Sequence, residues 1–185
     1  MKKSLIIVSG WSCTGKTTLV KQIGERFSLP VFGRDDFKES LFDSLGYSNR
    51  QRSREFGVAS YQLLYLVADK ILAAGNSMVI ESNFKVNPDT KKLKNFKNKY
   101  QCNLLQIHCY APISVALARF KTRSLSGERH PGHVDHLISE ELEANLKQGG
   151  YEILDICDRT LRVDATNFAE INYENICHWL KDNLY

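Results

Sequence analysis

The stretch Gly10–Thr17, GWSCTGKT, is the feature that most constrains the fold of this chain. A short apolar run, Leu5–Val8, precedes it, and Thr14–Phe27 follows with apolar residues spaced as on one face of a helix. An apolar strand, a glycine-rich turn and an amphipathic helix in this order are typical of an α/β unit. The sequence therefore predicts that Gly10–Thr17 joins the first strand of the chain to its first helix.

The rest of the chain repeats this alternation of apolar runs and amphipathic segments. Further strands are expected at Pro30–Phe32, Ser77–Ser82, Asn103–Tyr110 and Arg159–Thr166. Further helices are expected at Arg54–Ala74, Pro88–Tyr100, Pro112–Arg123, Glu140–Lys147 and Ile171–Leu184. Strands that alternate with helices form a parallel sheet covered on both faces. We therefore expect a single α/β domain over residues 1–185, built as a three-layer sandwich around a parallel five-stranded sheet.

Composition narrows the class of protein. Hydrophobic residues make up 43% of the chain and charged residues 25%, which excludes a disordered or fibrous protein. The net charge of +4 is compatible with an anionic substrate but too small to indicate nucleic acid. The scattered cysteines lack zinc-binding spacing, so we expect reduced thiols in a cytoplasmic protein. The apolar start is too short for an export signal, and no apolar run approaches the roughly 18 residues of a membrane span.

Gly10–Thr17 matches G-x-x-x-x-G-K-S/T, the phosphate-binding P-loop. The glycines let backbone N–H groups converge on phosphate oxygens, and the positive end of the following helix adds to that field. Lys16 would reach the β- and γ-phosphates, and the Thr17 hydroxyl would ligate magnesium. A plain strand-to-helix turn is disfavoured because motif and context agree. We expect ATP and Mg²⁺ as cofactors in a P-loop NTPase sandwich. The residues expected to bind the nucleotide here are Gly10, Trp11, Ser12, Cys13, Thr14, Gly15, Lys16, Thr17 and Thr18.

The sequence lacks the motifs that define other classes of P-loop protein. A guanine-reading N-K-x-D motif is absent. Asp43–Gly46 spells the D-x-x-G of GTPases, but it follows an amphipathic segment instead of a strand, which indicates a helix end. Leu125–Glu128 resembles the LSGGQ signature of transporter ATPases, yet no apolar strand ending in Asp-Glu follows it. We interpret it as part of a solvated loop.

Asp35 and Asp36 follow the second predicted strand in the string GRDDFKES. They lie at the carboxyl edge, where open α/β sheets hold their ligands. One carboxylate there can take a proton from a hydroxyl that attacks the γ-phosphate of ATP. The other can cap the helix that begins with FKESLF. We expect Asp35 to be the general base.

Four segments resemble a known family in their order and spacing: GWSCTGKTT, GRDDFKES, VIESN and ALARFKTR. They are similar to the kinase domains of the bacteriophage polynucleotide kinase family, whose small relatives include the chloramphenicol phosphotransferase and zeta-toxin groups. The resemblance spans about Lys2 to Thr166 and is most specific in the P-loop and the Arg-Asp-Asp string. It implies that Asp35 is the general base and that Lys38 contacts the acceptor.

The same resemblance implies roles at the later segments. Arg119 and Arg123 would hold the ATP donor, and the backbone around Thr166 would pass over adenine. Glu81 departs from the aspartate that the relatives usually carry after the third strand. Three roles are open for Glu81: it binds magnesium through water, contacts the substrate or caps the edge of the sheet. Asn83 follows it in the same segment and is a further candidate substrate contact.

Arg119 and Arg123 are four residues apart, hence on one face of a helix. Arginine planes suit adenine stacking and bidentate phosphate binding, although such a pair can also be a solubilising surface feature. We expect Arg123 to be catalytic and to belong to a lid over about residues 120–136. Within it, Ser124–Val134 is rich in Gly, His and Arg, which predicts a mobile loop instead of core. Arg129 either closes over the phosphates or is exposed.

Three histidines in this lid, His130, His133 and His136, are spaced by three residues. A metal site there is a minor alternative, because no carboxylate lies at a defined spacing from them.

The residues together predict an ATP-dependent phosphotransferase that moves the γ-phosphoryl group to a hydroxyl of a small-molecule or nucleotide-type acceptor. The alternatives are a polynucleotide 5′-hydroxyl kinase and a nucleotide-binding switch or ATPase. Nucleic acid is not favoured, because the basic segment Lys91–Lys99 is most simply a solvated helix face, with a weak contact to a phosphate backbone as the alternative. We expect the acceptor to be walled by the loops Leu41–Arg54 and Arg123–His136, and the oligomeric state is left open. The candidate substrate contacts are Arg34, Asp36, Lys38, Glu81, Asn83 and Arg129.

Overall fold

The computed structural model describes residues 3–135, 139–149 and 151–184. Its strands form one sheet in the order β2-β3-β1-β4-β5, and every neighbouring pair is parallel. The predicted α/β fold class and parallel five-stranded sheet are therefore confirmed. The strands are β1 (Ser4–Gly10), β2 (Val31–Gly33), β3 (Met78–Glu81), β4 (Asn103–Tyr110) and β5 (Arg159–Asp164).

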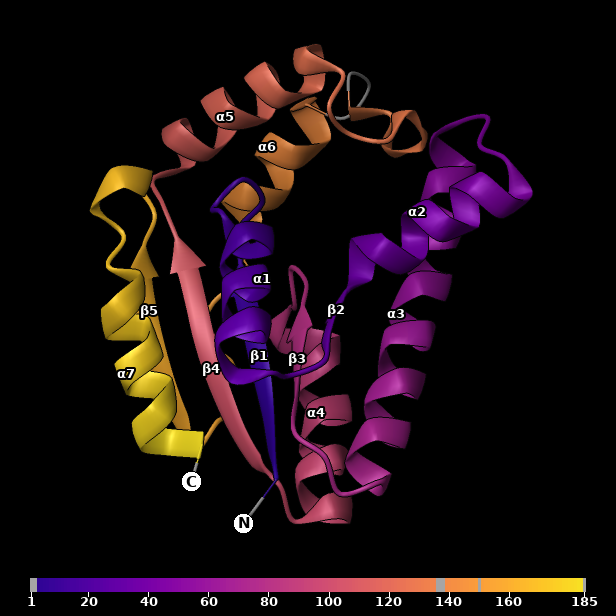
Figure 1. The fold of residues 1–185 in the computed structure, drawn as a ribbon. Helices are drawn as coiled ribbons and strands as arrows, with labels where there is room; N and C mark the ends of the chain where they lie inside the picture. Colours follow the sequence, from indigo (N-terminus) through magenta and orange to yellow (C-terminus); the bar gives the residue numbers. More distant parts are fainter. Residues whose placement is uncertain (1–2, 136–138, 150, 185) are drawn as a thin grey trace.

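Helices cover both faces of the sheet and form the predicted three layers (Figure 1). The helices are α1 (Lys16–Phe27), α2 (Arg34–Leu45), α3 (Arg50–Ala73), α4 (Val86–Tyr100), α5 (Ile113–Ser126), α6 (Ser139–Gln148) and α7 (Tyr173–Leu184). Because side chains alternate along a strand, β1 contributes to both cores. Leu5 and Ile7 pack with residues of α3 and α4, whereas Ile6 and Val8 pack with residues of α1 and α7.

The carboxyl ends of the parallel strands meet at one edge of the sheet, beneath α5 and α6 (Figure 1). Val8 of β1 lies in register with Glu81 of β3, and Gly33 of β2 lies in register with the same glutamate. The P-loop, the start of α2 and the residues after β3 therefore leave the sheet side by side. This edge brings the segments with the predicted site residues together.

The region between β2 and α3 contains more helix than expected. α2 ends at Leu45, which confirms that Asp43–Gly46 is a helix end. α3 begins at Arg50, where the Asn49 side chain accepts a hydrogen bond from the Arg52 backbone N–H at 3.0 Å. The prediction that Leu41–Arg54 is a loop is thus wrong for most of these residues. The reason is that the cap and first turn of α3 are polar and lie outside its apolar periodicity.

The segment expected to be a loop outside the core is partly buried. α5 continues to Ser126, and a 3₁₀ turn forms at Pro131–His133. His133 and Val134 are only 3% and 9% exposed, so the prediction that Ser124–Val134 avoids the core is wrong for the last residues of this segment, whereas Leu125 is 85% exposed. The last residue of the predicted lid, His136, lies outside the described residues.

Helix α3 is the one described helix that is long and apolar enough to cross a membrane, judged by length and composition alone. Its residues Leu64, Ala68 and Leu72 are completely buried in the core beside β1 and β3. Packing against the sheet therefore accounts for the apolar face of α3.

Candidate active site

The P-loop has the conformation that its glycines predict. Gly10 has φ 121°, and a Cβ atom there would lie 1.9 Å from the carbonyl oxygen of Cys109 on β4. Cys13 and Gly15 also have positive φ angles, 61° and 75°, and Gly15 is the N-cap of α1. A non-glycine residue held at positive φ is strain of the kind that collects at ligand sites. The loop therefore forms an anion cradle at the positive end of α1.

Lys16 is buried, and its ammonium group is turned back onto its own loop. Its Nζ donates a hydrogen bond to the Trp11 carbonyl at 2.5 Å and lies 4.0 Å from the Glu81 carboxylate. Burial lowers the pKa of Lys16 from its ordinary value, and the Glu81 charge acts in the opposite direction. A buried cation with one carbonyl and one distant carboxylate is well placed to exchange these partners for phosphate oxygens.

Thr17 and Glu81 bring two oxygen ligands together at the start of α1. The Thr17 hydroxyl donates to Glu81 Oε2 at 3.3 Å, and burial raises the pKa of Glu81. Hydroxyl and carboxylate oxygens are the donors that Mg²⁺ prefers, so the pair fits this ion. Nearby, Asn83 Nδ2 donates to Ser12 Oγ at 2.9 Å and ties the end of β3 to the P-loop.

The two neighbouring aspartates of α2 have different surroundings. Asp36 Oδ2 accepts a hydrogen bond from the Gly33 backbone N–H at 2.8 Å, so this carboxylate caps the helix. Asp35 instead lies between two guanidinium groups, with Arg34 and Arg129 each 2.5 Å from one of its oxygens. Burial acts to raise the pKa of Asp35, but the two arginines outweigh it and hold this pKa far below its ordinary value. Asp35 is therefore ionised at neutral pH.

Arg129 connects the lid to the site. Besides Asp35, its guanidinium group contacts both carboxylate oxygens of Asp135, at 3.0 and 3.1 Å. Arg123 lies 3.7 Å from the same Asp135. The Nε of Arg123 is buried without a hydrogen-bond partner within the described part of the chain. An unpaired buried donor beside the P-loop fits a triphosphate oxygen as its missing partner.

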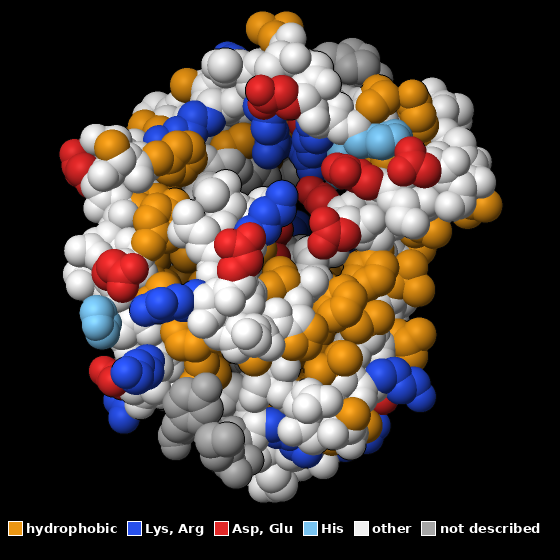
Figure 2. All heavy atoms as spheres, viewed as in Figure 1, with side chains coloured by type: hydrophobic (Ala, Val, Ile, Leu, Met, Phe, Trp, Pro, Cys, Tyr) orange, Lys and Arg blue, Asp and Glu red, His pale blue; other side chains and the backbone are white. Residues whose placement is uncertain are grey.

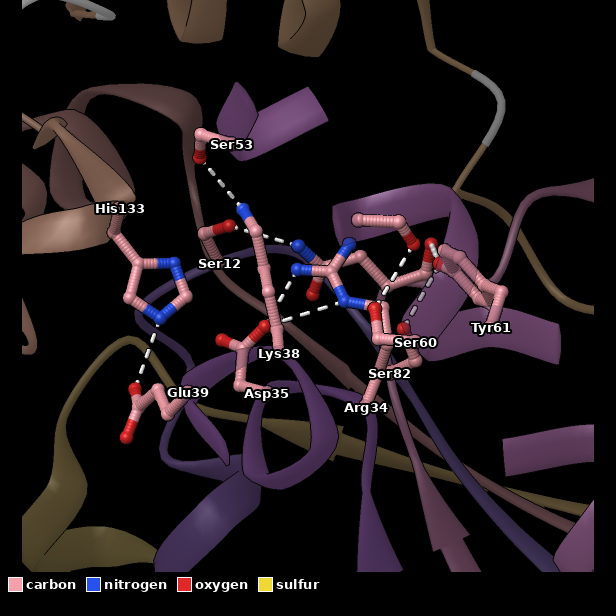
Figure 3. Close-up of polar contacts among 12 residues, drawn as sticks. Ser12, Arg34, Asp35, Lys38, Glu39, Ser53, Ser60, Tyr61, Ser82 and His133 are labelled. Carbon is pink, nitrogen blue, oxygen red and sulfur yellow. Dashed lines mark hydrogen bonds and ion pairs between the residues drawn. The ribbon is translucent and has the colours of Figure 1, made fainter. Parts of the chain in front are cut away.

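The 3₁₀ turn of the lid packs on α2. The ring centroids of His130 and His133 lie 5.1 and 5.4 Å from that of Phe42, and a Cβ atom at Gly132 would lie 2.6 Å from the Phe42 ring. His133 also contacts Glu39 at 2.9 Å (Figure 3), and burial with the Arg129 charge lowers the pKa of His133 to about 2. Among the residues that the structure describes, no group of three His, Cys, Asp or Glu side chains can hold a metal ion.

These groups surround one cavity of about 370 Å³, which opens where charged side chains gather below α5 and α6 (Figure 2). The predicted site residues that line it are Ser12, Cys13, Thr14, Gly15, Lys16, Thr17, Thr18, Arg34, Asp35, Lys38, Glu81, Asn83, Arg123 and Arg129. The predicted site residues that are not among its lining are Gly10, Trp11, Asp36, Arg119 and Thr166.

Comparison with known proteins agrees with this geometry. A family model described as an AAA domain matches residues 5–148. The chain belongs to this AAA-domain family. A crystal structure described as a "putative kinase" from Chloroflexus aurantiacus is 34% identical over 100% of both chains, with a TM-score of 0.89. The AAA-domain chain thus has a P-loop kinase-like fold along its whole length.

More distant structures share the fold of the AAA-domain chain. A gluconokinase from Sinorhizobium meliloti is 17% identical over 98% of both chains, with a TM-score of 0.54. The APS kinase of Mycobacterium tuberculosis, solved in complex with AMPPNP and APS, is 13% identical over 98% of this chain and 96% of its own, with a TM-score of 0.58. A search of the curated proteins gave no match.

Arg119 occupies a different place in the AAA-domain chain from its helix neighbour Arg123. Its guanidinium group donates to the carbonyl oxygens of Ala165 and Thr166 at 2.6 and 2.9 Å, and it lies 3.7 Å from the centroid of the Phe168 ring. Arg119 therefore holds the end of β5 close to the P-loop. A role of Arg119 and Thr166 in binding the base of the nucleotide stays a prediction.

Sequence reasoning missed several residues of the cavity in this AAA-domain chain. Asp135 is only 7% exposed and lies between Arg123 and Arg129. Arg50 donates to both carboxylate oxygens of Glu141, at 2.7 and 3.1 Å. Arg50 and Glu141 are 91 positions apart, so neither signals the other in the sequence. Only the HPGHVDH run offered a local hint, because it places an acid beside the lid histidines.

Lys38 gives a pH-dependent prediction. Its Nζ donates to Ser53 Oγ at 2.9 Å (Figure 3), and burial, with the Arg34 charge, lowers the pKa of Lys38 to about 8. In the unfolded chain this lysine titrates near 10.5. Between these values the unfolded state binds more protons at this position, so its contribution to the free energy of unfolding rises with pH. This rise should be absent in Lys38→Met.

The measurement is urea unfolding of both proteins at pH 8 and pH 10. The free energy of unfolding of the wild type should gain about 1–3 kcal/mol relative to Lys38→Met over this range. The exposed Lys70→Met is the matched control and should follow the wild type. Parallel pH profiles for wild type and Lys38→Met would contradict the lowered pKa.

Proposed function

We propose that this chain is a kinase that transfers the γ-phosphoryl group of ATP to a hydroxyl of a small-molecule or nucleotide-type acceptor, with Mg²⁺. The observation that carries the proposal is the position of Asp35. Its carboxylate lines the same cavity as Lys16 and the P-loop amides, and arginines of the lid reach into that cavity. A base opposite a triphosphate cradle is the arrangement that phosphoryl transfer to a hydroxyl needs.

Each group then has a defined part in the reaction. The P-loop amides and Lys16 hold the triphosphate. Asp35 accepts the proton of the acceptor hydroxyl. At the same time the hydroxyl oxygen bonds to the γ-phosphorus, and the bond between the γ-phosphorus and the bridging oxygen breaks, so that this oxygen leaves with ADP. Arg123 and Arg129 stabilise the negative charge of the group in transfer. Mg²⁺ held by Thr17 and Glu81, directly or through water, would supply further neutralisation of the phosphates.

One observation favours a kinase over a nucleotide-binding switch. A kinase needs space for a second substrate beside the base, and a second, larger cavity of about 540 Å³ adjoins the first, with Arg34 and Asn83 lining both. The family resemblance to polynucleotide kinases stays a prediction, and with it the alternative of a polynucleotide 5′-hydroxyl as acceptor.

The test is a screen of hydroxyl acceptors with labelled ATP and Mg²⁺. We expect ADP release to be stimulated by a subset of acceptors, with the label recovered on the acceptor in equal amount. A switch or simple ATPase would instead release inorganic phosphate at a rate that no acceptor changes. Label found only in inorganic phosphate across the whole screen would contradict the proposal.

A further inference from the structure

The second cavity is built mainly by helices. α3 contributes Tyr61 and Tyr65, α4 contributes Lys91 and Lys92, and Tyr151 comes from the segment between α6 and β5. The loops expected to wall the acceptor site, Leu41–Arg54 and Arg123–His136, contribute none of its described lining residues. Lys91 and Lys92 belong to the basic segment that the sequence predicted to be most simply a solvated helix face, with a weak phosphate-backbone contact as the alternative. We call this space the Tyr–Lys cavity.

The Tyr–Lys cavity adjoins the cavity of the catalytic groups. Arg34 and Asn83 line both large cavities, and a small cavity lined by Arg34, Asp35, Glu81, Ser82 and Asn83 lies at the same place. Its edge is held firmly, since Tyr61 donates to the Asn83 carbonyl at 3.1 Å and accepts from Ser82 Oγ at 2.8 Å. The Tyr–Lys cavity therefore lies next to the cavity that Asp35 lines.

Aromatic rings form the apolar walls of the Tyr–Lys cavity. The Tyr61 and Tyr65 ring centroids lie 6.1 Å apart at an interplanar angle of 30°. The Arg34 guanidinium lies 5.3 Å from the Tyr61 ring centroid, and the Lys85 ammonium lies 5.2 Å from that of Tyr151. Flat rings beside fixed cations are a surface on which a planar ring of a ligand can stack.

The cavity carries an excess of positive charge. Arg34 is paired with Asp35, but three further cations, Lys85, Lys91 and Lys92, line the cavity against one carboxylate among the described residues. That carboxylate, Asp89, is already used, because it accepts from the Tyr65 hydroxyl at 2.5 Å and from a backbone N–H at 2.7 Å. No carboxylate in the described part of the chain forms an ion pair with Lys91 or Lys92. These two lysines are therefore available to an anion.

We propose that the Tyr–Lys cavity is the acceptor subsite and that it takes a small acceptor with both a planar ring and an anionic group, of the nucleoside monophosphate class. This assignment rests on the proposed function. The tyrosines stack the ring, Lys91 and Lys92 bind the anion, and a hydroxyl of the acceptor faces Asp35. A cavity of about 540 Å³ is in the range of sites for single small molecules.

Three probes separate the two features that the site recognises. Uridine 5′-monophosphate carries ring and anion, uridine carries the ring alone, and ribose 5-phosphate carries the anion alone. Binding of each is measured by calorimetry with the P-loop saturated with AMPPNP and Mg²⁺. We expect uridine 5′-monophosphate to bind about tenfold or more tightly than either partial probe, because base stacking and charge pairing each contribute.

Variants connect this preference to the cavity. Lys91→Gln/Lys92→Gln should weaken binding of uridine 5′-monophosphate about tenfold and leave uridine within about twofold. Tyr151→Leu should reduce the advantage of uridine 5′-monophosphate over ribose 5-phosphate, because Tyr61 and Tyr65 remain. Lys70→Gln/Lys94→Gln is the matched control, because it removes two exposed lysines from α3 and α4 that are not among the residues lining the cavity. It should behave as wild type.

The outcomes that overturn the two proposals differ. Absence of AMPPNP binding, measured first on the same protein, would contradict the proposed function. Normal AMPPNP binding with equal affinity for uridine and uridine 5′-monophosphate would contradict only the acceptor assignment. An equal loss in the Lys70→Gln/Lys94→Gln control would do the same, since the effect would then come from overall charge.

Discussion

Asp35→Asn is expected to lower kcat by about 10²–10⁴-fold, the range that loss of a general base produces. The amide cannot accept the proton of the acceptor hydroxyl, but it keeps the size and polarity of the side chain. The P-loop amides and Lys16 are untouched, so the Kd for ATP should stay within about twofold. The measurements are steady-state turnover with a saturating acceptor and direct titration of ATP.

Asp36→Asn provides the matched control for this result. Its carboxylate accepts from the Gly33 N–H, and the asparagine carbonyl can accept the same hydrogen bond. Because Asp36 is at the N3 position of α2 and its hydrogen bond to the N-cap Gly33 is kept, stability and turnover should both stay near wild type. Unchanged turnover in Asp35→Asn, or an equal loss in Asp36→Asn, would remove the assignment of Asp35 as the base.

Lys16→Met is expected to lower kcat/KM by about 10²–10³-fold, because it removes a charged donor from the phosphates in a site shielded from water. The free energy of unfolding should instead rise or stay the same. Burial lowers the pKa of Lys16, which means that the folded state disfavours this charge when no nucleotide is bound. Methionine fills a similar space without that desolvation cost. Activity is followed by ADP release and stability by urea unfolding.

Lys21→Met separates the local effect from the loss of one positive charge. Lys21 is exposed on the same helix, α1, and is not among the residues lining the nucleotide cavity. Its replacement should leave both kcat/KM and the free energy of unfolding near wild type. Equal activity of Lys16→Met and Lys21→Met would mean that the triphosphate does not bind at the P-loop.

Local patterns were sufficient for the sheet and for the nucleotide side of the site. The apolar run Leu5–Val8 and the glycines of the P-loop are short-range signals, and the structure places a strand and a left-handed turn there. The pair Asp35 and Asp36 also signalled a polar helix start, but the sequence alone did not separate their roles. The separation comes from Arg34 and Arg129 around Asp35 and from the Gly33 backbone at Asp36.

Long-range contacts explain what the sequence could not predict. Arg129 reaches Asp35 across 94 positions, and the 3₁₀ turn of the lid is buried because its histidines contact Phe42 of α2. The Tyr–Lys cavity has the same origin. Its tyrosines and lysines lie on segments far apart in the chain, so neither a lysine stripe nor interleaved aromatics occur in the linear order.

Gly10 is at once the last residue of β1 and the first residue of the P-loop. A methyl group at this position would collide with the main chain of the adjoining strand, as the 1.9 Å approach to the Cys109 carbonyl oxygen requires. Relief of that collision would have to move either the strand or the amides that hold the phosphates. The space for a single Cβ atom at Gly10 therefore couples sheet pairing to nucleotide affinity. A substitution at Gly10 alters both properties together.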